Sequence, residues 1–339
     1  YNLWLSCWEM YRGLADHSDK DDWQSKIVLP KPWAVVKQAT STIRRLLTTS
    51  KQPWSLEPYN PDDLLLQNRA SKMTRLTNVF LEKGNYMEAF AEALECGFIM
   101  GIGILKLWWG LSPRLSTKVE IVTSPISGMS EAPPGYSGQQ KQVVQEETLE
   151  GRLFIKAVDP FKFFWLPGSR LNQWVGTIED LETPKWKLTE LADAGVFDPA
   201  AVSQLQPMKL DERERQNYVR FNERAMPVGG PNSDTGNVVV TEFYGPVVIN
   251  GRLVERNGHI IIGNNNVLLL AQPNKLWSKR APYIGYTPLS VPFRTEGVGL
   301  IEMTREINRA MSKLANMSVD TLAFKLSPLM EVVVDAYEN

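Results

Sequence analysis

The stretch TEGVGLIEMTREINRAMSKLANMSVDTLAFKL, residues 295–326, decides the fold. As a helix it would be about 45 Å long, at about 1.5 Å per residue. Apolar residues recur at steps of three and four, which places them on one face: Leu300, Met303, Ile307, Met311, Leu314 and Met317. The remaining face is polar and carries Glu302, Arg305, Glu306, Arg309, Lys313, Asn316 and Asp320. The pattern predicts a long helix with an apolar side and a solvent-facing side, and taken alone it also fits a surface helix lying on a globular core.

The composition of the chain limits the class of protein to which this helix can belong. The chain has 339 residues, more than one core usually supports, so we expect two or more lobes. Lys and Arg number 37 against 38 Asp and Glu, a net charge of -1, so the sequence lacks the basic footprint of a protein that grips nucleic acid. Two cysteines suit a reducing compartment, and no apolar run reaches the roughly 18 residues that span a membrane.

The first part of the chain reads as mostly helical. Helical spacing covers residues 1–17, 33–47, 63–83 and 87–98. Short β candidates follow at 101–109, 118–122, 143–144 and 152–158, with an exposed Gly/Pro/Ser-rich loop at 125–142. We therefore expect an α+β protein.

A second β region precedes the long helix. Residues 184–205 read as helix, turn and helix, 209–225 as a charged segment that is helical if anything, and 227–237 as a loop. The strands VVVTEFYGPVVI, GRLVERNGHIII and NVLLLAQ then follow, with turns at Asn250-Gly251 and Asn257-Gly258. The pattern predicts a small antiparallel β module that protrudes between helical regions.

The motifs of catalysis, metal binding and cofactor binding are absent from the sequence. His17 and His259 have no second ligand at metal spacing, and no nucleophile motif occurs. The glycines of GFIMGIG, residues 97–103, match neither a dinucleotide-binding loop nor a P-loop, so we expect them to allow close packing of a helix on a sheet. We predict no enzyme activity, no metal and no cofactor, although acid and base groups far apart in sequence stay untested at this stage.

Several stretches taken in order resemble the portal (head-to-tail connector) proteins of tailed bacteriophages, particularly short-tailed ones. The resemblance covers roughly residues 1–330 and is carried by KIVLPKPW (26–33), EAFAEALECGFIMGIGILKLWW (88–109), VDPFKFFWLPG (158–168), TEFYGPVVINGRLVERNGHIIIGNNNVLLL (241–270) and PFRTEGVGLIEM (292–303). It implies a portal-like fold: residues 1–181 as the wing, 182–226 as the first stem and wing helices, 227–281 as a clip-like β module, 282–326 as the second stem helix, and 327–339 as the start of the tunnel loop, with further chain beyond.

The resemblance also implies a function. Portal proteins form rings, typically of twelve subunits, at one vertex of the capsid, where double-stranded DNA is packaged and later ejected. It implies docking of a terminase motor, a tail adaptor and the major capsid protein, assembly in the host cytoplasm, a place in the virion and no membrane. The polar side of the long helix would line the channel, and Leu300, Met303, Ile307, Met311 and Leu314 would pack between subunits.

Two other interpretations stay open at the level of sequence. One is a non-viral structural or adaptor oligomer with a β module on a helical stalk. The other is a carbohydrate-active enzyme that recognises sugars through its eleven Trp residues. A deep aromatic cleft in a monomer would favour the enzyme, and a symmetric ring with an axial hole would remove it.

Overall fold

The fold is described from a computed structural model of the chain. The structure describes residues 1–14, 20, 21, 23–49, 54–123, 139–206, 236–264 and 266–326, with the backbone alone at 111–123 and 139–150. The chain divides into two compact units, one made of Tyr1–Lys51, Met87–Lys106 and Lys156–Asn339, the other of Gln52–Tyr86 and Leu107–Ile155. The predicted α+β class is confirmed.

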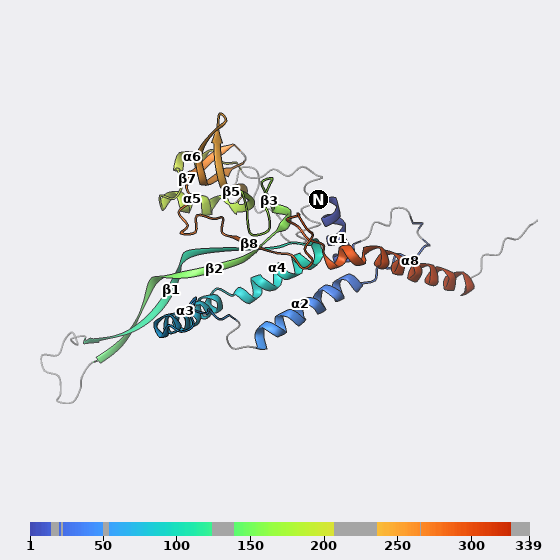
Figure 1. Ribbon diagram of the computed structural model, residues 1–339, viewed down its shortest axis with the longest axis horizontal. Helices are drawn as coiled ribbons and strands as arrows, with labels where there is room; N and C mark the ends of the chain where they lie inside the picture. The colour runs from blue at the N-terminus through green and yellow to red at the C-terminus, as the bar shows by residue number, and fades with distance from the viewer. Residues whose placement is uncertain are drawn as a thin grey trace, which may run out of the picture. The chain divides into compact units, whose positions relative to one another are not determined.

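Four helices of the first unit share one core. They are α1 (Asn2–Arg12), α2 (Lys31–Thr49), α4 (Tyr86–Met100) and α8 (Leu300–Leu326), labelled in Figure 1. Their apolar faces meet because Cys7, Val36, Phe98 and Ile301, one from each helix, are all buried in a single cluster. The helical pattern of the sequence is thus confirmed here, with bounds shifted by a few residues.

The long helix begins at Leu300, five residues later than the sequence suggests. The cause is the close approach of the preceding loop to the end of α4. A Cβ atom at Gly299 would lie 2.6 Å from the carbonyl oxygen of Ile99, and a Cβ at Gly297 would collide with the backbone of Leu289. Because only glycine fits there, the two glycines serve the loop rather than the first turn of a helix.

The glycines at residues 97–103 also serve packing, as the sequence suggests. A Cβ at Gly103 would collide with the backbone carbonyl of Ala93, and Gly101 has a φ of 83°. Gly101 also accepts a hydrogen bond on its carbonyl oxygen from the Gly297 N–H at 3.1 Å. This corner therefore holds the end of α4, the start of β1 and the entry to α8 together through their backbones.

A five-stranded antiparallel sheet forms the centre of the first unit's β structure. Its order is β3 (Phe163–Trp165), β4 (Thr177–Pro184), β5 (Asn237–Ile249), β6 (Arg252–Gly263) and β7 (Val267–Pro273). The predicted turn at Asn250-Gly251 is present, with φ values of 52° and 76° that suit a tight hairpin. The short helices α5 (Lys185–Asp193) and α6 (Pro199–Ser203) cover this sheet through Leu188, Val202 and Val238.

This sheet corrects the predicted separate β module at 227–281. Strand β5 pairs with β4 from Thr177↔Tyr244 to Pro184↔Asn237, so strands that the sequence assigned to three regions form one sheet. The predicted boundary between residues 181 and 182 lies inside β4. Sequence periodicity could not show this, because the two strands are separated by more than fifty residues. The predicted segments at 209–225 and 327–339 lie outside the described residues.

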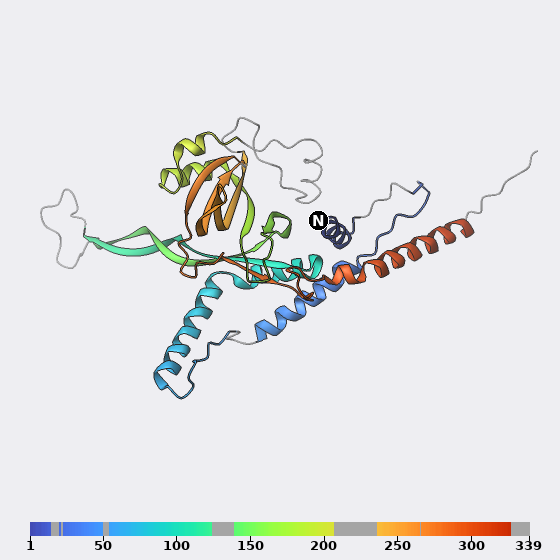
Figure 2. The ribbon, with the colours of Figure 1, turned by 45° about the horizontal axis from the view of Figure 1, so that its top comes forward.

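The second sheet has three strands, in the order β2 (Gln139–Val158), β1 (Gly103–Thr123) and β8 (Tyr283–Tyr286). The four short β candidates predicted between 101 and 158 are in fact parts of the two long strands β1 and β2, drawn as an extended ribbon in Figures 1 and 2. In the first unit a core cluster containing Ile104, Phe163, Tyr244 and Tyr283 joins residues of the two sheets.

The second unit contains α3 (Leu64–Lys83) and most of the β1–β2 pair. Helix α3 begins at an Asp63 cap, whose carboxylate accepts a hydrogen bond from the Leu65 N–H at 2.8 Å. Aromatic pairs hold the helix and the strands: Trp109 meets Phe80 edge-on with centroids 5.2 Å apart, and Trp108 stacks on Phe154 at 5.4 Å.

Candidate functional site

Helix α8 buries one side against its own chain. Ile301 is 1% exposed in the four-helix core, and the helix contacts both α1 and α2. Successive residues of an α-helix are rotated by about 100°, so Asn308, Ser312 and Ala315 fall on the side of Ile301. Each of these three is half-buried. The side that α8 uses within its own chain is therefore made mostly of small and polar residues.

The predicted apolar face lies on the opposite side of α8 and is largely bare. We call it the apolar stripe: Leu300, Met303, Ile307, Met311, Leu314 and Met317. Leu300 and Met311 are half-buried, whereas Met303, Ile307, Leu314 and Met317 are 61%, 62%, 63% and 55% exposed. Leu300 packs against the four-helix core, but the described residues leave the other four exposed, and four large apolar side chains on one helix face are costly in water.

The charged side of α8 lies between these two sides and comprises Glu302, Arg305, Glu306, Arg309 and Lys313. Glu306 accepts from two arginines on one oxygen, Oε1, at 3.1 Å from Arg305 Nε and 3.1 Å from Arg309 Nη1. Arg309 also reaches Ser6 of α1 at 3.4 Å. The helix thus neutralises part of its own charge.

The structure places the predicted solvent-facing Asn316 elsewhere. Asn316 is 7% exposed and bonds the backbone of Ile27 twice: its Oδ1 accepts from the Ile27 N–H at 2.8 Å and its Nδ2 donates to the Ile27 carbonyl at 3.0 Å. Its Oδ1 also accepts from Ser25 Oγ at 2.9 Å, and Asp320 accepts from the Ser25 N–H at 2.8 Å. The assignment of Asn316 to the solvent-facing side is therefore corrected.

Residues 23–27 form a strap along the outer half of α8, as both ribbon views show. Besides the bonds to Asn316 and Asp320, Trp23 meets Phe324 edge-on with centroids 5.1 Å apart. The strap runs in the direction opposite to the helix, because residue 23 faces 324 while residue 27 faces 316. No sequence pattern links these segments, which are about 290 residues apart.

A buried charge network was also missed by the sequence analysis. Glu179 on β4 is 2% exposed and binds Lys106 of β1 at 2.7 Å and Lys156 of β2 at 3.0 Å. Glu242 on β5 pairs with the same Lys106, and its Oε1 lies 2.9 Å from His259 Nε2. We call this the Glu179–Glu242 network.

Two tyrosines complete the Glu179–Glu242 network. Tyr283 donates to Glu179 at 2.8 Å and Tyr244 donates to Glu242 at 2.8 Å, so both buried carboxylates are fully engaged. Burial by itself would raise the pKa of Glu242, but hydrogen bonds from His259, Lys106 and Tyr244 and the charge of Lys106 together lower that pKa to about 2. The network ties the two sheets together through Lys106, Lys156, Glu179 and Glu242.

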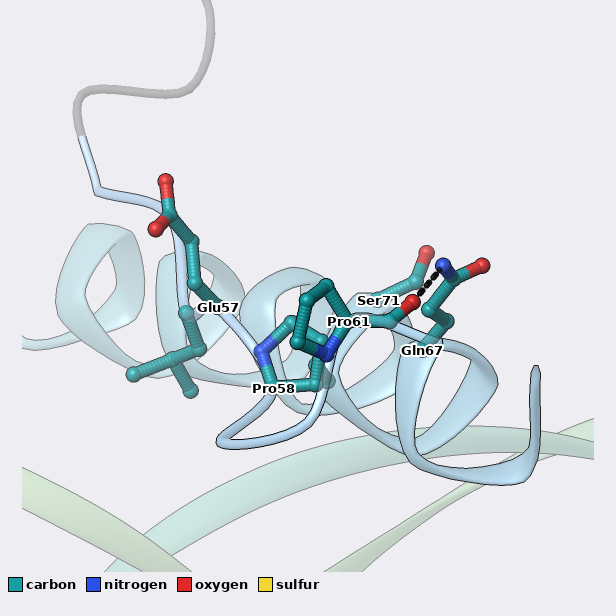
Figure 3. A pocket seen from close by; sticks show the side chains of 7 residues that line it. Glu57, Pro58, Pro61, Gln67 and Ser71 are labelled. Carbon is teal, nitrogen blue, oxygen red and sulfur yellow. Dashed lines mark hydrogen bonds between the residues drawn. The ribbon is translucent and has the colours of Figure 1, made fainter. Parts of the chain in front are cut away.

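A hollow in the second unit has a volume of about 460 Å³ and is shown in Figure 3. Its lining consists of Leu56, Glu57, Pro58, Pro61, Gln67, Ala70 and Ser71. Glu57 is its single ionisable group, and it holds no Trp. The hollow therefore lacks both the paired carboxylates of a glycosidase and the aromatic floor that a sugar-binding cleft would need.

Two further searches cover the described part of the chain. Within it, His, Cys, Asp and Glu side chains form no group of three or more that could hold a metal ion. Among its helices, none combines the length and apolarity needed to cross a membrane.

Two comparisons with known proteins bear on the identity of the chain. A search of curated proteins finds no match. A family model described as "Phage SU10 portal protein" matches residues 5–339, which is nearly the whole chain. The match identifies the chain as a member of this family of bacteriophage portal proteins.

Proposed function

We propose that copies of this chain pack side by side through α8 into a closed ring around a channel for double-stranded DNA. Membership of the portal family supports a structural role in the virion and in DNA packaging. The observation that carries the proposal is the apolar stripe. Its exposed members, Met303, Ile307, Leu314 and Met317, lie on the helix side away from Ile301, which the described part of the chain leaves uncovered.

A ring covers the stripe without leaving an open end. Each copy would present its stripe to a different surface of the next copy, and such head-to-tail contacts close into a ring when the rotation between copies divides a full turn. Burying a Leu, Ile or Met side chain contributes about 1.5–3 kcal/mol, so four exposed members of the stripe supply a substantial drive for assembly. Twelve copies, as the resemblance implies, is the number that we propose.

The charged side of α8 would then face the channel. Its five charged residues are two Glu and three Arg or Lys, and two of the cations already share Glu306. Affinity for DNA grows with the number of phosphates that cations neutralise, so a lumen with few free cations lets DNA slide. Asn316 and Asp320 are no longer part of this lining, because both hold the strap.

We further propose that the ring serves as the platform for a packaging motor, a tail adaptor and the capsid shell. The support is the family alone, and the surfaces for these partners are unassigned. In this scheme α8 is a stem helix.

The test is the assembly state of the purified protein, imaged by negative-stain microscopy and weighed in solution. We expect symmetric rings with an axial hole and a mass equal to a whole number of subunits. A single monomeric species at micromolar concentration would remove the proposal.

A further inference from the structure

The loop that enters α8 carries a second exposed apolar side chain, on a backbone that disfavours it. We call residues 289–298 the Phe293 loop. The ends of this loop form an antiparallel bridge, in which the Val298 N–H donates to the Leu289 carbonyl at 2.9 Å. At its tip, the Arg294 N–H donates to the Val291 carbonyl at 3.2 Å and closes a tight turn around Pro292 and Phe293.

Phe293 occupies the position of this turn that favours glycine. Its φ is 65°, and the residue before it is a proline, the pattern of a type II turn. Such turns take Gly or Asn at this place, because a Cβ atom crowds the backbone in the left-handed region. A bulky phenylalanine here is an outlier that points to a use for its side chain.

The Phe293 side chain makes no contact with the described part of the chain that would offset this strain. The residue is 95% exposed, and no ring contact of Phe293 is found among the described residues. The fold therefore bears two costs at one position, a disfavoured backbone and an apolar ring in water. Burying the ring against another molecule would remove its exposure to water, and the free energy gained would offset the cost of the backbone conformation.

The loop around Phe293 is held firmly, as a contact surface requires. Thr295 is 6% exposed and donates from Oγ1 to the Ser169 carbonyl at 2.8 Å. Gly297 is hydrogen-bonded to Gly101, and Arg294 Nε lies 3.1 Å from the carboxylate of Glu296. A rigid loop that displays one aromatic ring loses little conformational entropy on binding.

We infer that Phe293 is an anchor that inserts into the neighbouring copy of this chain in the ring. The inference rests on the proposed ring and identifies a second point of contact in it. Phe293 lies seven positions before Leu300, the first member of the apolar stripe, a span of at most about 25 Å. A copy that covers the start of the stripe therefore lies beside the loop.

Charge argues against DNA as the occupant. The one cation at the tip, Arg294, is paired with Glu296, so the tip offers no free positive charge to phosphates. A lone aromatic ring is also a poor platform for nucleic acid, which usually stacks on several. Aromatic anchors near the centre of an interface, by contrast, commonly dominate protein association.

The experiment compares two substitutions, Phe293→Gly and Phe293→Ala, with the wild-type chain. Both remove the ring, so we expect both to raise the protein concentration at which half of the chains are assembled by about tenfold or more. Phe293→Tyr keeps an aromatic ring and should assemble at nearly the wild-type concentration. Lys279→Gly, which relieves another positive φ (52°) at an exposed residue, is the matched control and should also leave assembly unchanged.

A second measurement separates the strain from the contact. In a chain kept monomeric by Ile307→Asp, Phe293→Gly should melt about 1–2 °C above Phe293→Ala, because glycine alone fits the left-handed turn. If Phe293→Gly and Phe293→Ala assemble like the wild type, the anchor is overturned while the ring stands. Wild-type chains that form no ring at all would instead remove the proposed function. Should Phe293→Gly melt below Phe293→Ala, the turn is not strained and the inference also fails.

Discussion

Asn316 shows how one amide can fix the course of two segments. Its side chain offers one acceptor and one donor group to the backbone of Ile27, in the way that a neighbouring β-strand would. Because Asn316 is buried, removing the amide leaves the Ile27 N–H and carbonyl without this partner, whereas the Ser25 hydroxyl keeps its bond to the Asn316 backbone carbonyl at 3.1 Å. The strap therefore depends on a residue that looks like one more polar position on a helix.

The strap gives the first prediction. We expect Asn316→Leu to lower the free energy of unfolding by about 3 kcal/mol, since each buried group left unpaired costs about 1–3 kcal/mol. Hydrogen exchange at residues 23–27 should become faster in the same variant. The control is Ser318→Ala, two residues further along the helix, whose exposed hydroxyl bonds only the Leu314 carbonyl in its own helix. Equal losses in the two variants would contradict the role of the strap.

The Glu179–Glu242 network gives a prediction on pH. The folded state holds the pKa of Glu242 at about 2, below the ordinary value of 4.5. Between these two pH values the folded chain therefore binds fewer protons than the unfolded chain. Stability from this group is present above pH 4.5 and is lost as the pH falls from about 4.5 to about 2. Glu242→Gln should remove this part of the acid dependence, measured as Tm against pH.

At neutral pH the same substitution should destabilise the fold. Glu242→Gln weakens the pairing of buried Lys106, and breaking a buried ion pair costs about 3–5 kcal/mol. Glu182→Gln is the control, because Glu182 on β4 pairs with a half-exposed Lys162 at 2.6 Å and such pairs contribute about 0–1 kcal/mol. An acid profile of Glu242→Gln that parallels the wild type would show that the network does not hold the carboxylate in its charged form.

At the scale of elements, α8 separates three tasks on three sides. The side of Ile301 packs on the chain itself, four members of the apolar stripe are exposed, and the charged side lies between these two sides. Substitutions on the charged side and on the apolar stripe should therefore have opposite effects on ring assembly and on DNA packaging, which is the third prediction.

Replacing Arg305, Arg309 and Lys313 together by Gln should leave ring assembly intact and alter DNA packaging or retention. Each lost phosphate contact should reduce the salt dependence of DNA binding by about one unit. Replacing Ile307 or Leu314 by Asp should instead stop assembly, since an unpaired charge on a buried surface costs several kcal/mol. Both positions are exposed in the single chain, so the Asp variants should fold.

The two sides of α8 would be assigned in reverse if the triple Gln variant failed to assemble while the Asp variants formed normal rings. Particle mass in solution and retention of packaged DNA are the two measurements. Circular dichroism of each variant confirms that the fold is present.

The sequence predicts α8 well because its evidence is local. Ile307 and Leu314 can be placed on one side of a helix by spacing alone. The structure differs in where the helix begins and in burying Ile301, which the sequence analysis did not single out. Asn316 was misplaced because spacing shows which side a residue occupies but not what covers that side. Its partner, Ile27, belongs to a segment without a periodic pattern of its own.

The sheets and the buried network depend on contacts between residues far apart in sequence, which sequence patterns do not reveal. The carboxylates Glu179 and Glu242 and their shared Lys106 lie on three strands that are far apart in sequence. Each looks like a charged residue on a strand, which usually faces solvent. Strand pairing brings them together, and the pairing of β4 with β5 was the part of the topology that the sequence left open.

At the scale of the whole molecule, the family and the absence of a phosphate-binding loop in the sequence lead to a fourth prediction. The isolated protein should not hydrolyse ATP, because the glycines at 97–103 are used for backbone packing and have no Lys-Ser/Thr after them. Packaging energy would then come from a separate motor. Phosphate release measured with purified rings tests this, and hydrolysis abolished by Gly101→Ala in folded protein would contradict it.

The backbone corner at the head of α8 has a mechanical consequence. The entry to the helix touches the end of α4 and the start of β1 through main-chain atoms at Gly101, Gly297 and Gly299, with no side chain between them. Side chains can change rotamer under load, whereas main-chain atoms in direct contact have little room to yield. A force along the axis of α8, such as moving DNA would exert on a channel wall, would therefore be transmitted to the four-helix core with little local deformation.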